Sequence, residues 1–129
     1  MASHTVLVVE DETFIRLDTC AHLRECGYTV IEVSNAEDAI STIYRHPEID
    51  LVFTDVRMPG NMDGLDLARW ILENKPNTPV MIATGDLGRV SAMHELCGVE
   101  TFIKPYDHDK IVDRIRRALA KKSSGEQPH

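Results

Sequence analysis

The sequence of 129 residues is short of cysteine, of positive charge and of long apolar runs, and each shortage excludes a class of protein. Its three cysteines, Cys20, Cys26 and Cys97, are odd in number and show neither zinc-ligand nor disulfide-framework spacing. The 21 acidic residues outnumber the 14 basic ones, and the net charge of −7 argues against a nucleic-acid-binding face. No apolar run approaches the roughly 18 residues of a membrane span, and the N-terminus lacks a secretory signal. We therefore expect a cytoplasmic protein with reduced thiols that binds neither nucleic acid nor a membrane.

What the sequence does contain is an alternation of short β-branched runs with helix-length segments. The apolar runs predict five strands, at Thr5–Val9, Thr29–Val33, Asp50–Thr54, Pro79–Ala83 and Thr101–Ile103. Periodic apolar positions and capping residues predict helices over 13–26, from Ser34 or Asn35 to Pro47, and over 64–74, 87–96 and 107–121.

Near-continuous apolar strands that alternate with helices are typical of a parallel sheet covered on both faces. The prediction is an α/β fold, a (βα)5 doubly wound five-stranded parallel sheet in the flavodoxin-like order 2-1-3-4-5. At this length we expect one domain, over residues 4–121. Residues 122–129 form a polar tail without a hydrophobic side chain to bury, so we expect this tail to be disordered.

Charged and polar side chains follow four of the five predicted strands. Glu10 and Asp11 follow the first strand, Asp55 the third, Thr84 the fourth and Lys104 the fifth. In such sheets ligands bind outside the carboxyl ends of the strands, so these groups converge on one edge. Crowded carboxylates are unfavourable unless their pKa values rise or a divalent cation joins them. An all-oxygen site suits Mg²⁺, with Mn²⁺ as the alternative, and we predict the metal between Asp11 and Asp55.

The same groups have the chemistry for phosphoryl transfer. Asp55 is already ionised at neutral pH, so it needs no general base to act as a nucleophile that forms an acyl phosphate. The metal, Lys104 and the Thr84 hydroxyl supply the positive charge and hydrogen bonds for the phosphoryl oxygens. Solvated loop acids and a surface lysine are the simpler interpretation of each residue alone. The convergence of all five groups on one edge favours a functional site.

Four motifs carry a resemblance to a known family: V-V-E-D-E, F-T-D-V-R-M-P-G, I-A-T-G and F-I-K-P-Y. Over roughly residues 4–120 the sequence resembles the receiver domain of two-component response regulators. The stretch M-P-G-N-M-D-G-L-D-L-A-R and the T-G after the fourth strand also resemble single-domain receivers of alphaproteobacteria. The resemblance implies that a histidine kinase or a histidine phosphotransfer protein, or a small donor such as acetyl phosphate, phosphorylates Asp55.

The resemblance also implies roles for the neighbouring residues. Mg²⁺ would be held by Asp11, Asp55 and the backbone carbonyl of Arg57, with Glu10 assisting through water. Thr84 would swing toward the phosphoryl group, and Lys104 would pair with it. The protein would then catalyse only its own phosphorylation and dephosphorylation and would not otherwise be an enzyme.

The output implied by the resemblance is a change in partner affinity. The surface involved would be formed by the fourth and fifth strands and the last two helices. The downstream partner is not identified by the sequence. We expect a monomer or a weak phosphorylation-dependent dimer, and a stand-alone or terminal receiver in preference to one excised from a longer protein.

The sequence departs from the usual receiver pattern at Glu10, where aspartate is common, and again before the lysine. Most receivers carry an aromatic residue three positions before the lysine, where this sequence has Thr101, with Phe102 next. Either Phe102 acts as the switch or signalling relies on movements within 85–100, and the second option is slightly favoured; Phe102 is equally well interpreted as a core side chain. Arg57 and Asp86 flank the site, and we hypothesise that their ion pair slows hydrolysis, with two independent solvated charges as the alternative.

Three functions fit this sequence. The first is a phosphorylation-competent receiver, and the second is an unphosphorylated binding module, which would normally lack part of the acid, aspartate, threonine and lysine set. The third is a phosphatase or a nucleotide-binding enzyme. A nucleotide binder would need glycines after the first strand in place of E-D-E, and a phosphatase would need a general acid beside its nucleophile. We therefore favour the first function.

Overall fold

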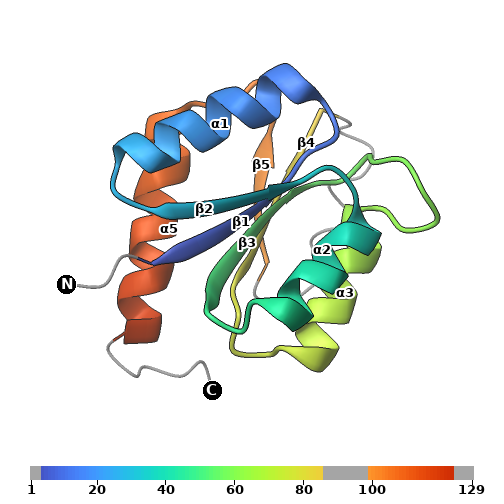
Figure 1. Ribbon diagram of the computed structural model, residues 1–129. Helices are drawn as coiled ribbons and strands as arrows, with labels where there is room; N and C mark the ends of the chain where they lie inside the picture. The colour runs from blue at the N-terminus through green and yellow to red at the C-terminus, as the bar shows by residue number, and fades with distance from the viewer. Residues whose placement is uncertain (1–3, 86–98, 124–129) are drawn as a thin grey trace.

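Five parallel strands form a single sheet in the order β2-β1-β3-β4-β5, as predicted (Figure 1). The computed structural model describes residues 4–85 and 99–123. The strands are β1 Thr5–Val9, β2 Thr29–Val33, β3 Ile49–Asp55, β4 Val80–Thr84 and β5 Glu100–Ile103. The helices are α1 Thr13–Glu25, α2 Ala36–Arg45, α3 Gly64–Asn74 and α5 His108–Ser123. The helix predicted over 87–96 lies outside the described residues, and α5 continues two residues past the predicted domain end at 121.

The helices cover both faces of the sheet, α1 and α5 on one side and α2 and α3 on the other (Figure 1). Every residue of β1 is buried, and its side chains alternate between the two layers. Val6 and Val8 pack toward α1 and α5, whereas Leu7 and Val9 pack toward α2 and α3. A central strand buried on both faces has no polar side, which explains the continuous apolar run in the sequence.

Local sequence signals place the helix ends. Asn35 is the N-cap of α2, because its side-chain oxygen accepts the backbone N–H of Asp38 at 2.7 Å. A reciprocal capping box of Asp63 and Asp66 opens α3. Gly27 follows the end of α1 with a φ of 97°, a left-handed conformation that suits a residue without a Cβ. These caps resolve the choice between Ser34 and Asn35 in favour of Asn35.

The register of the strands brings the predicted polar residues to one edge. Asp55 of β3 pairs with Ala83 of β4, and Thr84 of β4 pairs with Ile103, the residue before Lys104. At the end of β1, the backbone N–H of Glu10 donates to the Val33 carbonyl of β2 at 3.1 Å. The carboxyl ends of β1, β3, β4 and β5 therefore lie at the same level. Within the described residues no helix combines the length and apolarity needed to cross a bilayer.

Candidate functional site

Three carboxylates meet at the carboxyl edge of the sheet. Each of Glu10, Asp11 and Asp55 offers an oxygen, and these oxygens lie within 4.8 Å of one another. Glu10 and Asp55 are only 4% and 8% exposed, whereas Asp11 is open to solvent. One Glu10 oxygen, Oε2, accepts the backbone N–H of Glu12 at 3.2 Å. Two buried acids therefore face an exposed one, which leaves the cluster accessible from outside.

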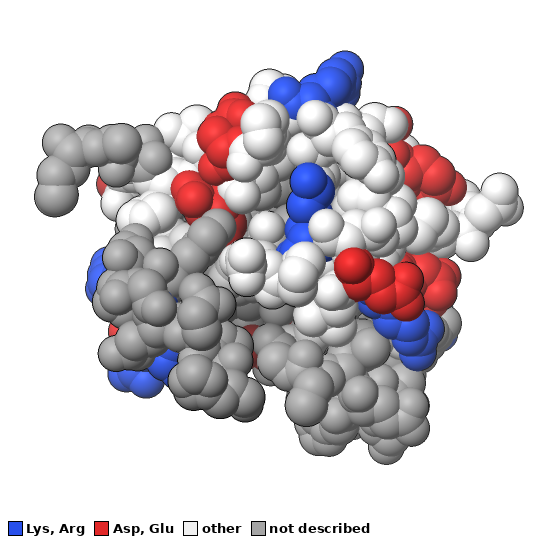
Figure 2. All heavy atoms as spheres, turned by 90° about the horizontal axis from the view of Figure 1, so that it is seen from below, with Lys and Arg blue, Asp and Glu red and all other residues white. Residues whose placement is uncertain are grey.

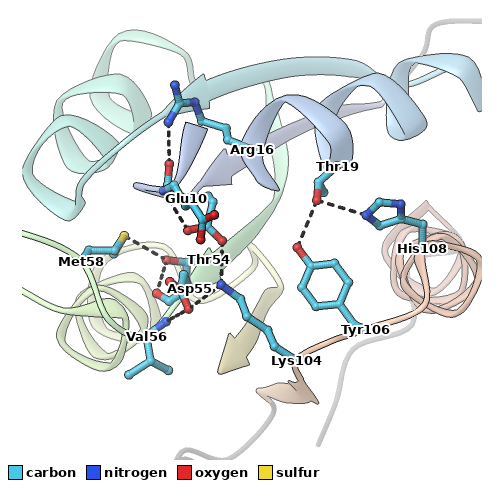
Figure 3. A network of polar contacts seen from close by, with 11 residues as sticks. Glu10, Arg16, Thr19, Thr54, Asp55, Val56, Met58, Lys104, Tyr106 and His108 are labelled. Carbon is cyan, nitrogen blue, oxygen red and sulfur yellow. Dashed lines mark hydrogen bonds and ion pairs between the residues drawn. The ribbon is translucent and has the colours of Figure 1, made fainter. Parts of the chain in front are cut away.

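Lys104 extends from the segment after β5 to two of these acids (Figure 3). Its Nζ lies 2.8 Å from Glu10 Oε1 and 3.3 Å from Asp55 Oδ1. Its backbone N–H donates to the Thr84 carbonyl at 2.8 Å, so pairing of β5 with β4 fixes where the side chain begins. The lysine ammonium thus compensates part of the negative charge that the strand ends bring together.

Burial and charge shift the pKa values in this cluster. Desolvation by burial raises the pKa of Glu10, and the nearby charge of Asp55 adds to this rise although the hydrogen bond from Lys104 opposes it. Burial likewise raises the pKa of Asp55, with Lys104 opposing the rise and Asp11 adding to it. Burial disfavours the charged Lys104, but its contacts with Glu10 and Asp55 outweigh this effect and raise its pKa. The negative charge of the cluster is therefore incompletely neutralised by the protein itself.

The backbone around Asp55 is tightly folded. The Val56 N–H donates to Asp55 Oδ1 at 2.9 Å and so orients the carboxylate. The Gly64 N–H donates to the Val56 carbonyl at 2.7 Å, which brings the start of α3 back against the end of β3. A Cβ at residue 64 would collide with the Asp55 carbonyl oxygen and lie 2.8 Å from the Val56 Cα. Glycine is required at position 64 by this close approach.

The remaining predicted site residues take the following places. Thr84 is buried at the end of β4, next in the sheet to the end of β3. Arg57 is exposed and lies in the loop between β3 and α3. Asp86 lies outside the described residues, so the predicted ion pair with Arg57 stays a prediction.

The two candidate switch residues, Thr101 and Phe102, occupy neighbouring positions on β5. The Thr101 hydroxyl is buried and has no hydrogen-bond partner among the described residues. Phe102 is partly buried with the α1 and α5 layer, and its ring meets that of Phe53 edge-on at 6.2 Å between centroids. This contact is that of a core side chain, which fits one of the two interpretations of Phe102.

Several residues near the site escaped prediction. The Tyr106 hydroxyl lies 3.0 Å from Thr19 Oγ1, and the Tyr106 ring stacks edge-on against Phe53 at 5.6 Å. His108 Nε2 lies 3.4 Å from the same Thr19 hydroxyl (Figure 3). Arg16 donates to the Glu10 backbone carbonyl at 2.8 Å. Tyr106 lies two residues after Lys104 in the motif F-I-K-P-Y. No local sequence pattern predicts its contact with Thr19 on α1, because the two residues meet only in the folded protein.

The donor set fits a hard divalent cation. All three side chains at the cluster offer carboxylate oxygens, the ligands that Mg²⁺ prefers, and one of them is open to water. Mg²⁺ is usually bound by one or two carboxylates while it keeps several waters. A cluster with two buried acids and one exposed acid offers this kind of partial coordination.

Comparison with known proteins identifies the family. The model of the response regulator receiver domain matches residues 6–116, so this chain belongs to the receiver domains of two-component response regulators. It is 28% identical over 126 residues to sporulation initiation phosphotransferase F of Bacillus subtilis, covering 96% of this chain and all of that protein. It spans 26% of the length of another relative, which is a DNA-binding transcriptional regulator.

Solved structures agree with this family. A response regulator receiver protein from Sinorhizobium medicae matches with a TM-score of 0.85 and 27% identity, covering 93% of this chain and 97% of that one. The response regulator TrrA from Thermotoga maritima, in complex with Mg²⁺ and BeF, matches with a TM-score of 0.82 and 28% identity over 90% of this chain and 99% of that one. Receiver domains are signalling domains that are phosphorylated on an aspartate.

Proposed function

We propose that Asp55 accepts a phosphoryl group from a phosphohistidine of a histidine kinase or a phosphotransfer protein. The observation that carries this proposal is the arrangement of the Asp55 carboxylate, with Lys104 Nζ 3.3 Å away and two further acids within ligand distance. An Asp55 oxygen attacks the phosphorus, and the phosphorus–nitrogen bond to the donor breaks with its electron pair returning to the imidazole. The product is an acyl phosphate on Asp55.

The reaction is proposed to require Mg²⁺, for which Mn²⁺ would substitute. Glu10, Asp11 and Asp55, with the backbone carbonyl of Arg57, would hold the ion. When bound, the cation neutralises the charge of the acids and of the phosphoryl oxygens. The carboxylate cluster of this chain and the Mg²⁺ complex of the Thermotoga receiver support this assignment.

Lys104 and Thr84 are proposed to bind the phosphoryl oxygens. Lys104 already lies beside Asp55, and its ammonium is available to pair with an oxygen of the acyl phosphate. The Thr84 hydroxyl belongs to the neighbouring strand end, from which it would donate a hydrogen bond. Hydrolysis by water breaks the phosphorus–oxygen bond and regenerates the Asp55 carboxylate, and Arg57 would slow this step by pairing with Asp86 across the site mouth.

The output is proposed to be a change in affinity for a protein partner through β4, residues 86–98, β5 and α5. Thr101 and Phe102 on β5 are the candidates that would couple this surface to Lys104. We infer a cytoplasmic monomer or a weak phosphorylation-dependent dimer, without direct binding to nucleic acid or membrane. On the face shown in Figure 2, basic and acidic side chains lie in small separate groups, and no broad basic area forms among the residues described there.

Trapping the acyl phosphate tests this function. After incubation with a phosphorylated histidine phosphotransfer protein and Mg²⁺, borohydride reduces an aspartyl phosphate to homoserine, and peptide mass spectrometry locates it. We expect homoserine at residue 55 and at neither Asp50 nor Asp63, which flank it in the sequence. Homoserine at another acid, or transfer that persists in chelator, would contradict the proposal.

A further inference from the structure

The backbone of Glu10 is held from both sides at the end of β1. Its N–H donates to the Val33 carbonyl of β2 at 3.1 Å. Its carbonyl accepts a hydrogen bond from Nη1 of Arg16, in the first turn of α1, at 2.8 Å (Figure 3). The Arg16 side chain is 17% exposed, so this hydrogen bond is partly protected from water. Glu10 is thus fixed by a sheet bond and by a charged hydrogen bond from the following helix.

The Arg16 guanidinium is itself oriented by the edge strand. Its Nε lies 3.2 Å from Oε1 of Glu32 on β2. The other oxygen of Glu32 lies 3.3 Å from Nη1 of Arg24, and Arg24 Nη2 donates to the Val30 carbonyl at 3.0 Å. A planar guanidinium that bonds two acceptors at once loses little further freedom, so the contact with Glu10 is directional. The contacts of Arg24 with Glu32, of Glu32 with Arg16 and of Arg16 with Glu10 form a chain from the last turn of α1, through β2, to the site.

In this arrangement Arg16 does not occupy the carboxylate of Glu10. Arg16 bonds the backbone carbonyl, while Oε1 of Glu10 faces Lys104 and Oε2 accepts the Glu12 N–H. An arginine placed on the carboxylate would compete with a cation for its oxygens, but an arginine on the carbonyl does not. Asp11 follows Glu10 directly, so the same anchor also fixes where its side chain begins.

We propose that Arg16, oriented by Glu32, is a positioning residue that holds Glu10 and Asp11 in the arrangement that binds Mg²⁺. This inference rests on the proposed function of the acid cluster as the metal site. The expected effect of Arg16 on Mg²⁺ affinity is opposite to the effect of its charge, because a positive charge beside a cation site weakens cation binding by repulsion. If positioning dominates, loss of Arg16 weakens Mg²⁺ binding even though that repulsion is removed.

Calorimetric titration of Mg²⁺ into the unphosphorylated protein tests the inference. Arg16→Met removes the charge and every donor but keeps an aliphatic side chain, and we expect its Kd for Mg²⁺ to rise roughly tenfold, as for other residues that orient metal ligands. Arg16→Lys keeps the charge but lacks the planar guanidinium that bonds both the Glu10 carbonyl and the Glu32 carboxylate, so we expect a smaller rise in Kd. Arg69→Met is the matched control, since it removes the same charge from an exposed ion pair with Asp66 at 3.7 Å on α3.

The rate of Asp55 phosphorylation supplies a second readout. At saturating Mg²⁺ the Arg16→Met rate should return to the wild-type value, because only the ion's affinity is affected. An unchanged or lower Kd in Arg16→Met, or an equal rise in Arg69→Met, would overturn the inference while leaving wild-type Mg²⁺ binding intact. A wild-type protein that binds no Mg²⁺ would instead overturn the proposed function, and the inference with it.

Discussion

Burial has opposite effects in the apolar part of β3 and at the edge where β3 ends. It stabilises the apolar side chains, whereas it disfavours the charged form of the carboxylates. Leu51, Val52 and Phe53 are almost fully buried among apolar side chains, where each removed methyl group costs stability. Two residues further on, Asp55 is nearly as buried but shares its surroundings with Asp11 and Glu10. Burial raises the pKa of Asp55, so its charged form is disfavoured in the folded protein. The core therefore stabilises the fold on which the site depends, and the site retains uncompensated negative charge that favours binding of a metal cation.

The largest loss of stability is expected from a substitution in the apolar core, away from the charged edge of the sheet. Ile71 on α3 is fully buried in the α2 and α3 layer, so Ile71→Ala should lower the free energy of unfolding by about 2 to 5 kcal/mol through lost burial and a cavity. Ile71→Val should cost roughly 0.5 to 1.5 kcal/mol. Urea unfolding followed by Trp70 fluorescence measures both. A Mg²⁺ affinity that fell in step with stability would contradict the separation of the two regions.

A substitution at Gly64 acts on both regions at once. In Gly64→Ala the added Cβ meets the Asp55 carbonyl and the Val56 Cα, so the backbone must shift, at a cost of about 1 to 3 kcal/mol. We expect slower phosphorylation as well, because the shift displaces the phosphoacceptor. Gly85→Ala is the control for stability, since the nearest atom to its added Cβ is the Lys104 Cβ at 4.0 Å. Equal losses of stability in the two variants would show that the close approach is unimportant.

At the charged edge a substitution should stabilise the protein. Asp11→Asn removes a charge that raises the pKa of Asp55, so the metal-free protein should gain up to about 1 kcal/mol, a gain limited by solvent screening at this exposed residue. The same variant should lose most of the rise in Tm that Mg²⁺ gives the wild type, because ligand binding stabilises only the state that binds. A destabilised variant that kept its Mg²⁺ response would contradict this account.

The smallest expected effect is a pH dependence of the core. Cys20 is fully buried, and burial raises its pKa from 9.0 to about 11. Between these values the unfolded protein loses the thiol proton first, so this contribution to stability is complete below pH 9 and is lost as the pH rises toward 11. From pH 8 to 9.5 the loss should be less than about 1 kcal/mol. Urea titrations of wild type and Cys20→Ala measure it as the difference in slope, and equal slopes would contradict it.

Sequence reasoning recovered the sheet because its signals are local. The apolar runs, the glycine after α1 and the capping residues of α2 act within a few residues, and the strand order followed from short parallel crossovers. The charged residues of the edge were equally predictable, because parallel strands end at one edge of the sheet. Glu10 and Lys104 directly follow β1 and β5, and Asp55 is the last residue of β3.

Contacts made only by tertiary packing were not predicted. The hydrogen bond of Arg16 to the Glu10 carbonyl depends on how α1 lies over the end of β1 and on Glu32 of a neighbouring strand. The contact of Tyr106 with Thr19 joins residues 87 positions apart. The orientation of the side chains on β5 was likewise not determined by the sequence, since periodicity alone does not say whether Phe102 packs inward.

The central claim is that Asp55 takes up a phosphoryl group in a metal-dependent reaction. The most direct measurement is the intact mass of the protein after acetyl phosphate and Mg²⁺, beside Asp55→Asn and a chelated sample. The account predicts a gain of about 80 Da, one phosphoryl group, in the wild type with metal and in neither control. A gain that survives in Asp55→Asn or in chelator would contradict the claim. So would the absence of any gain with acetyl phosphate and with a panel of phosphorylated histidine kinases, which would favour an unphosphorylated binding module.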